Sequence, residues 1–198
     1  EQVGKLKVIK AHYESLESRK AELEELILAL AAPYQQELAI LQTAPGIRSD
    51  FTAIGIISEI GTNMEAFPSA KHLCSWAGLT PTNNESAGKK KSVRVSKAGC
   101  YIKPLLVQCA NAVVTSKKHP EIRNRYLRLK KRRGHKKAII AIARMLLTAL
   151  YHMLKNGENY NAELYRKYDL PPVDREITVE QAIIIARNQG YKIKSSTA

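Results

Sequence analysis

The first thirty residues carry an apolar repeat that is compatible with one long helix. Apolar side chains recur at spacings of three and four, interrupted only by Lys20, at Leu6, Ile9, Tyr13, Leu16, Leu23, Ile27 and Leu30. This heptad spacing gives a narrow apolar seam, which is typical of a coiled coil. Pro33 stops or kinks the helix. We therefore expect residues 1–32 to be a coiled-coil segment that pairs with another chain or a distant segment. The alternative is an amphipathic helix folded back on its own domain.

The remaining sequence predicts a mainly α protein, with a compact helical domain over residues 33–160 and a tail over 161–198. The periodicity and the capping residues predict helices over 34–42, 51–60, 69–77, 101–118, 120–132, 136–155 and 178–188. The stretch 138–150 is apolar nearly all round, which is typical of a helix buried on several sides. The single tryptophan, Trp76, is expected in the core.

A Pro-Gly turn joins the helices expected over 34–42 and 51–60. This arrangement looks like a helix-hairpin-helix module, in which backbone N–H groups face a phosphate. The candidate phosphate-binding residues are Gly46, Ile47 and Arg48. That module usually has a second glycine where Arg48 stands, so a plain turn between two helices is the alternative interpretation.

Basic residues are concentrated in the middle of the chain. Of the 32 Lys and Arg residues, 17 lie between Lys89 and Lys137, and Glu121 is the one acid there, so this block carries +16 in a chain of net +14. A charge of this density attracts a polyanion, and nucleic acid is the first candidate. The alternative is a solvated charged face. The expected nucleic-acid contacts are Lys89, Lys90, Lys91, Arg94 and Lys97 in a first patch, Lys103, and Arg128, Lys130, Lys131, Arg132, Arg133, Lys136 and Lys137 in a second patch.

A serine stands beside the first patch. Residues 81–99 offer little from which to build a core, and the alternation over 92–96 predicts a short β-ribbon. The hydroxyl of Ser86 next to a dense cationic field suits attack on a phosphodiester, because cations stabilise charge on the non-bridging oxygens. The alternative is an ordinary loop or capping serine.

Several classes of protein are disfavoured. The carboxylates form no trio near the basic block, and the histidines lack ligand spacing, so we expect no metal site in this chain. Cys74, Cys100 and Cys109 are expected as free thiols in a reducing, cytoplasmic compartment. No apolar run has the form of a membrane span or a signal peptide. Because the sequence lacks a start Met, we expect it to be a fragment.

Two motifs carry a resemblance. The string A-G-L-T-P-T-N-N-E-S-A-G, which contains Ser86, is followed by V-S-K-A-G at Val95–Gly99 and an apolar helix. Together with the P-G-I turn and F-P-S-A-K-H-L at 67–73, this resembles the C-terminal domain of the DEDD-type insertion-sequence transposases. That family is named after insertion sequence one hundred and ten and includes the Piv-type DNA invertases. The likeness runs from about Leu38 to Leu154.

The resemblance implies a recombinase that cuts and joins DNA to move a mobile element. It implies that Ser86 is the nucleophile and forms a transient phosphoserine link. It also implies a RuvC-like domain, absent from this chain, whose DEDD carboxylates hold Mg²⁺. The implied partners are DNA, a guide RNA called the bridge RNA, and further copies of the chain, as a homodimer through the coiled coil and a tetramer in the synaptic complex.

Three departures from the family pattern are present. Cys100 stands where the family often has Asn, Lys103 replaces an Arg and loses bidentate geometry, and the RuvC-like domain is missing. A fragment of this kind is expected to bind nucleic acid without recombining it. The alternative functions are a helical module that binds DNA or RNA without catalysis, and a coiled-coil scaffold whose charge serves solubility.

Overall fold

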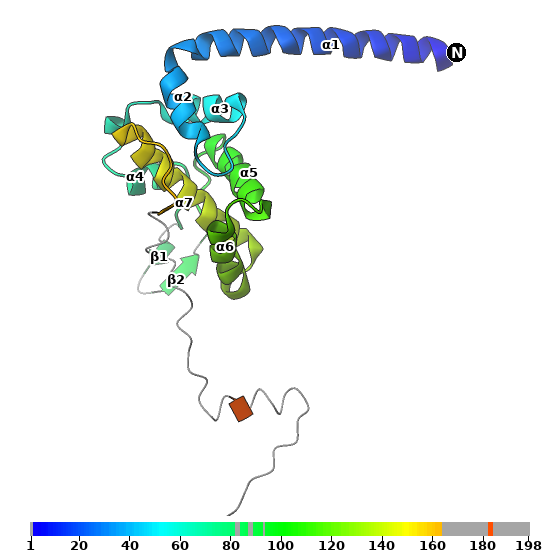
Figure 1. Cartoon of the computed structure of the whole chain (residues 1–198). Helices are drawn as coiled ribbons and strands as arrows, with labels where there is room; N and C mark the ends of the chain where they lie inside the picture. Colours follow the sequence, from blue (N-terminus) through cyan, green and yellow to red (C-terminus); the bar gives the residue numbers. More distant parts are fainter. Residues whose placement is uncertain (1, 82–83, 87–88, 93, 164–181, 184–198) are drawn as a thin grey trace, which may run out of the picture. The chain divides into compact units, whose positions relative to one another are not determined.

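The computed structural model describes residues 2–81, 84–86, 89–92, 94–163 and 182–183, and the chain is mainly helical, as the sequence predicts (Figure 1). The elements in chain order are α1 (Gln2–Ala31), η1 (Ala32–Tyr34), α2 (Gln35–Gln42), α3 (Asp50–Ile60), η2 (Met64–Ala66), α4 (Ala70–Trp76), β1 (Asn84–Ser86), β2 (Lys89–Ser92), α5 (Ile102–Thr115), α6 (Pro120–Arg133) and α7 (His135–Asn156).

Helix α1 is exposed along almost its whole length. Ala31, its last residue, is its one buried residue, and every apolar residue of the predicted seam is exposed. Pro33 lies in η1, where the long helix gives way to α2, so the predicted break is confirmed. The seam is not folded back onto the helical domain, and its pairing in a coiled coil stays a prediction.

Helix α7 forms the centre of the helical domain. It packs against α2, α4, α5 and α6, which surround it in Figure 1. Ile142, Leu147 and Leu150 are fully buried, as expected for a helix that is apolar nearly all round. By length and composition α7 could also cross a membrane, but 56% of the relevant window is buried inside the domain, as in the core helix of a globular protein.

The predicted helix boundaries hold to within a few residues. Ser69 caps α4 by accepting a hydrogen bond from the backbone N–H of His72, and Gly157 ends α7 in the left-handed conformation. The expectation for Trp76 was wrong, because its side chain is 44% exposed. Its ring packs against Phe67 with 5.7 Å between the ring centroids, so it lies on the surface of the domain rather than in its core.

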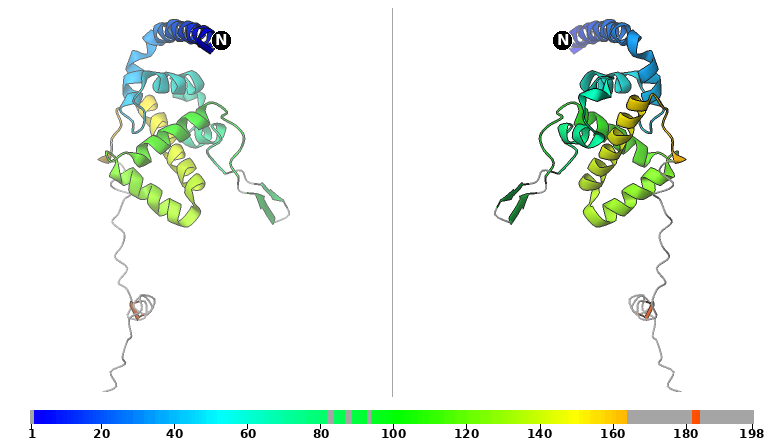
Figure 2. Two further views of the ribbon diagram at one scale, coloured as in Figure 1. Left: turned by 90° about the vertical axis from the view of Figure 1, so that its right-hand side faces the viewer. Right: turned by 90° about the vertical axis from the view of Figure 1, so that its left-hand side faces the viewer.

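A two-stranded antiparallel ribbon follows α4. Strands β1 and β2 pair with each other, and both views in Figure 2 show them standing off from the helices. The sequence predicts a ribbon, but over residues 92–96, whereas the strands lie earlier. Val95 belongs to the predicted stretch and forms an isolated antiparallel bridge with Pro81, which continues the pairing towards the domain.

By internal contacts the chain divides into residues 1–160 and residues 161–198. The first unit contains every helix and strand named above. The helix predicted over 178–188 lies outside the described residues, except for 182 and 183, which are helical.

Candidate nucleic-acid interface and serine ribbon

The two chain segments that enter and leave the ribbon are locked together by a pair of glycines. Gly78 and Gly99 both have φ of +66°. A Cβ added to Gly78 would fall 2.4 Å from the carbonyl oxygen of Ala98, and one added to Gly99 would fall 2.3 Å from the carbonyl oxygen of Ala77. Both distances are shorter than any real contact, so only glycine allows the two backbones to approach this closely.

A lysine reinforces this junction. The Nζ of Lys103, on the first turn of α5, donates a 2.6 Å hydrogen bond to the carbonyl oxygen of Ser96. The Oγ of Ser96 in turn accepts a hydrogen bond from the backbone N–H of Ala98 at 3.3 Å. Lys103, predicted as a nucleic-acid contact, therefore uses at least one of its three donors to hold the outgoing segment in place.

The register of the ribbon places Ser86 opposite a lysine. Ser86, the last residue of β1, pairs with Lys89, the first residue of β2, and Glu85 pairs with Lys90. Paired residues in an antiparallel ribbon have Cα atoms about 5 Å apart. The predicted nucleophile and the nearest predicted phosphate contact are thus cross-strand neighbours at the end of the ribbon. Of the other first-patch residues, Arg94 and Lys97 are exposed.

The second basic patch lies where α6 meets α7. Gly134, with φ of +80°, follows the last residue of α6 and is both the C-cap of α6 and the N-cap of α7, so the chain turns sharply there. The side chains of the predicted patch are all exposed on the two sides of this turn, namely those of Arg128, Lys130, Lys131, Arg132, Arg133, Lys136 and Lys137. Glu121, the one acid in the sequence of the two helices, is in the first turn of α6, far along the helix from the patch.

A tyrosine and a histidine hold the corner between the two helices. The hydroxyl of Tyr126, which is buried, lies 2.8 Å from Nδ1 of His135, and their rings meet edge to face. The Nζ of Lys130 lies 5.8 Å from the centroid of the Tyr126 ring, within reach of a cation–π interaction. These contacts fix the base of the patch while its outer cations stay in solvent.

Residues 38–127 match the Transposase IS116/IS110/IS902 family. The chain is also similar to a protein of Streptomyces coelicolor described as the insertion element IS110 uncharacterized 43.6 kDa protein, with 29% identity over 150 residues. That alignment covers 75% of this chain and 36% of the relative, so the chain spans about a third of the relative's length. Both comparisons therefore relate this chain to proteins of IS110-type insertion elements.

The transposase match includes the glycine junction, the serine ribbon and α5, and it ends at Leu127. The likeness predicted from the motifs continues to Leu154, so the match is shorter than that prediction. The second basic patch begins at Arg128, directly after the match. The comparison with the transposase family therefore covers the ribbon, and it does not extend to the second basic patch between α6 and α7.

The predicted phosphate-binding turn within the transposase match is largely packed inward. Ile47 is fully buried, and its backbone N–H is donated to the carbonyl oxygen of Ala44 at 3.2 Å. A Cβ on Gly46 would fall 2.5 Å from the carbonyl oxygen of Cys109, so the glycine is needed for the turn to pack against α5. Arg48 is exposed. Phosphate contact at this turn stays a prediction and depends on Arg48.

Among the described residues that match the transposase family, no cluster of side chains could bind a metal ion. Within the described ranges of the whole chain, no group of three or more His, Cys, Asp or Glu side chains is placed to hold one. By resemblance, the expected Mg²⁺ belongs to a RuvC-like domain. The described residues of this chain do not form a binding site for that ion. The three cysteines are free thiols; Cys74 and Cys109 are buried and Cys100 is exposed.

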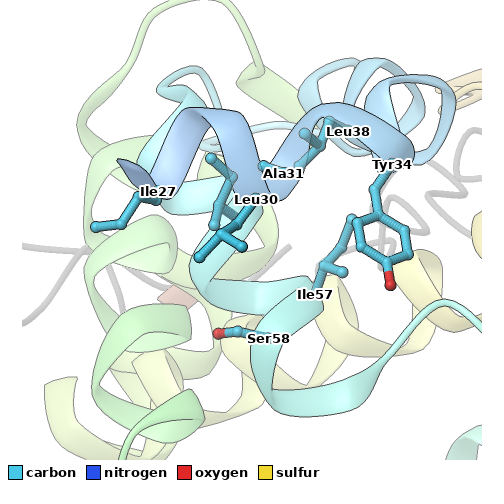
Figure 3. A pocket seen from close by; sticks show the side chains of 8 residues that line it. Ile27, Leu30, Ala31, Tyr34, Leu38, Ile57 and Ser58 are labelled. Carbon is cyan, nitrogen blue, oxygen red and sulfur yellow. The ribbon is translucent and has the colours of Figure 1, made fainter. Parts of the chain in front are cut away.

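An apolar pocket lies where the seam of α1 reaches the domain (Figure 3). It has a volume of about 280 Å³, and its lining includes Ile27, Leu30, Tyr34, Leu38, Ile57 and Ser58. Because Ile27 and Leu30 are also the last two seam residues, the apolar surface of α1 is continuous with α3. Apolar patches of this kind mark sites of protein contact.

Two features of the site were missed in the sequence. Gly78 reads as a simple helix stop and Gly99 as part of a motif, and their mutual contact has no sequence signal. Tyr101, directly after the junction, is 73% exposed. The sequence hint was an aromatic residue, Tyr101, two positions after a glycine of the V-S-K-A-G motif.

Proposed function

We propose that this chain is the serine-bearing, C-terminal part of a guide-RNA-dependent DNA transposase, and that Ser86 is its nucleophile. The observation that carries the proposal is the pairing of Ser86 with Lys89 at the end of a ribbon that lies inside the transposase match. The exposed cations around the ribbon and the concentrated positive charge of the chain support a polyanionic substrate.

The proposed step is transesterification at phosphorus. The Oγ of Ser86 attacks a DNA phosphodiester, a bond forms between Oγ and phosphorus, and the bond between phosphorus and one deoxyribose oxygen breaks. Ser86 gives up its proton and the leaving deoxyribose oxygen takes one up. Attack by a deoxyribose hydroxyl on the phosphoserine then reverses the exchange and joins a new strand, so the bond energy of the phosphodiester is retained.

The basic residues have separate roles in this proposal. Lys89, Lys90, Lys91, Arg94 and Lys97 neutralise the phosphates next to the reacting one, and positive charge there stabilises the pentacovalent transition state. The patch from Arg128 to Lys137 holds a second stretch of DNA or guide RNA. We further propose that a RuvC-like domain carried by the longer protein supplies the Mg²⁺ chemistry, and that the protein acts in the cytoplasm.

Assembly is proposed to run through α1. The unpaired seam and the pocket that continues it fit a homodimer joined by a coiled coil, with two dimers forming the tetramer of the synaptic complex. A heptad seam of about four repeats is long enough to pair with a second copy, whereas a solitary helix would leave this apolar surface in water.

The test is a covalent adduct. The longer protein that carries this chain behind its RuvC-like domain is incubated with labelled DNA, guide RNA and Mg²⁺ and run on a denaturing gel. We expect a protein-linked DNA band that is lost with Ser86→Ala and kept with Ser92→Ala, a matched serine on the other strand of the ribbon. An adduct that survives Ser86→Ala rules out this nucleophile. DNA that is retarded but never linked or cut favours a non-catalytic binding module.

A further inference from the structure

A groove between α3 and α5 lies next to the glycine junction. Its volume is about 510 Å³, in the range of about 300–1,000 Å³ that is common for small-ligand sites. Gly55 from α3 and Leu105 from α5 belong to its lining, and Tyr101 and Gln108 stand on the α5 side. A Cβ on Gly55 would fall 3.1 Å from Cδ2 of Leu105, so the absence of a side chain there lets α3 and α5 approach closely at the floor of the groove.

Tyr101 is the conspicuous residue of this groove. It is 73% exposed, the highest value among the large apolar and aromatic residues that the structure describes, and it lies two positions after Gly99. The junction of Gly78 and Gly99 and the hydrogen bond from Lys103 to Ser96 fix the backbone on which it stands. An aromatic ring with so little protein around it, on a rigid support, is suited to stack on a flat partner.

The polar residues of the groove suit a base rather than a phosphate. The lining contains the carboxylate of Glu59, the amide of Gln108 and the hydroxyl of Ser58, and no Lys or Arg. A carboxylate repels a phosphate but accepts a hydrogen bond from an exocyclic amine, as Glu and Asp do with cytosine N4. The nearby cations, such as the exposed Lys97, lie along the chain just before the groove and suit the backbone of the same strand.

We propose that the groove between α3 and α5 binds one unpaired base of the nucleic acid strand, stacked on Tyr101 and read at its edge by Glu59 and Gln108. This inference rests on the proposed function, because it assumes that the ribbon engages nucleic acid. It adds a base-binding site beside the serine ribbon, where a strand held at its phosphates would present a base that is out of its duplex.

The test uses the 198-residue chain and two DNA ligands of the same sequence, one single-stranded and one a blunt duplex, each with a fluorescent label. Stacking of a base on an aromatic ring contributes about 1–3 kcal/mol, so Tyr101→Ala should weaken single-strand binding by about 5- to 150-fold. Tyr101→Phe keeps the ring and should stay within about 2-fold. Duplex affinity and the salt dependence of both ligands should not change, because Tyr101 neutralises no phosphate.

A second readout reports stacking directly. A 2-aminopurine base in the single strand should lose fluorescence on binding, and Tyr101→Ala should abolish this quenching. Glu59→Ala should reduce the preference for oligo-dC over oligo-dT, since thymine has no exocyclic amine.

The outcomes separate the two proposals. If the chain binds DNA and Tyr101→Ala changes neither affinity nor quenching, the base site is wrong and the proposed function stands. If Tyr101→Ala alters self-association instead, the groove holds a second copy of the chain and the base site is wrong. If the chain binds neither DNA ligand at low salt, both the proposed function and the base site are wrong.

Discussion

Gly78 and Gly99 lie side by side in a backbone contact that leaves no room for a side chain on either residue. The carbonyl oxygen of Ala98 lies against Gly78, and that of Ala77 lies against Gly99. The contact closes the segment that carries Ser86 into a loop with a fixed base. The chemistry proposed at the end of the ribbon therefore depends on two residues without side chains, about eight and thirteen positions away from the serine in sequence.

Alanine at either junction glycine should destabilise the chain more than alanine at a matched glycine. Gly61 has φ of +70° and ψ of −179°, a region that favours glycine, and nothing lies within 4 Å of an added Cβ, so Gly61→Ala reports the conformational cost alone, about 1–3 kcal/mol. Gly78→Ala adds a backbone overlap with Ala98 and should cost clearly more in urea denaturation. Equal losses for Gly61→Ala and Gly78→Ala would show that the junction can relax.

Removal of charge from the corner of α6 and α7 should lower the salt dependence of DNA binding. Arg132→Gln together with Arg133→Gln should reduce the slope of log K against log salt by about 0.9 for each phosphate contact that is lost. The control is Lys7→Gln with Arg19→Gln, an equal change of charge on α1. If both pairs lower the slope equally, the corner is no specific contact and the chain's net charge alone attracts DNA.

Charge in the seam of α1 should prevent self-association. Leu16→Asp places a carboxylate in the proposed coiled-coil contact, and sedimentation should show a shift from dimer to monomer. Val8 is also exposed and apolar but lies off the seam, so Val8→Asp should leave the dimer intact. A chain that is monomeric before any substitution contradicts pairing through α1.

The cysteines should react in a fixed order. Cys100 is exposed and should be alkylated at pH 8, whereas Cys74 and Cys109 are buried and should react only on unfolding. Mass spectrometry after brief treatment with iodoacetamide measures this order. Rapid modification of Cys109 in the folded chain would contradict the packing of α5 described above.

Burial also makes the stability depend on pH. Burial raises the pKa of the Cys109 thiol from 9.0 to about 11, so the unfolded chain loses this proton first as the pH rises. The stabilising effect of the neutral thiol is complete below pH 9 and is lost between pH 9 and about 11. Urea denaturation across this interval should show a smaller decline for Cys109→Ala, whose starting stability is lower because of the cavity.

The helices were predictable because each depends on local sequence. The capping hydroxyl of Ser69, the helix-breaking Pro33 and the largely apolar stretch of α7 act within one or two turns, so their signals are visible without the fold. The ribbon was placed too late, because the short alternation over 92–96 outweighed the polar run of Lys89–Lys91. Pairing between strands depends on their register and on neighbouring segments, which polarity alone does not set.

The site was predictable in composition but not in arrangement. Charge counting finds both basic patches, and the motifs single out Ser86. The contact of Gly78 with Gly99 joins residues about twenty positions apart. The second role of Lys103 and the exposure of Trp76 depend on packing that no local pattern records. The pairing of Ser86 with Lys89 needed the strand register, which the sequence leaves open.

The contact between Gly78 and Gly99 closes the base of the ribbon, so the segment between them could be replaced without disturbing the helical domain. None of the side chains described between residues 80 and 101 is buried, and the core resumes at Ile102. A short linker in place of residues 80–97 should therefore leave a folded helical domain that has lost Ser86, the first basic patch and the hydrogen bond from Lys103 to Ser96. The residues proposed to act on DNA and the residues that keep the domain folded are therefore carried by separate parts of the chain.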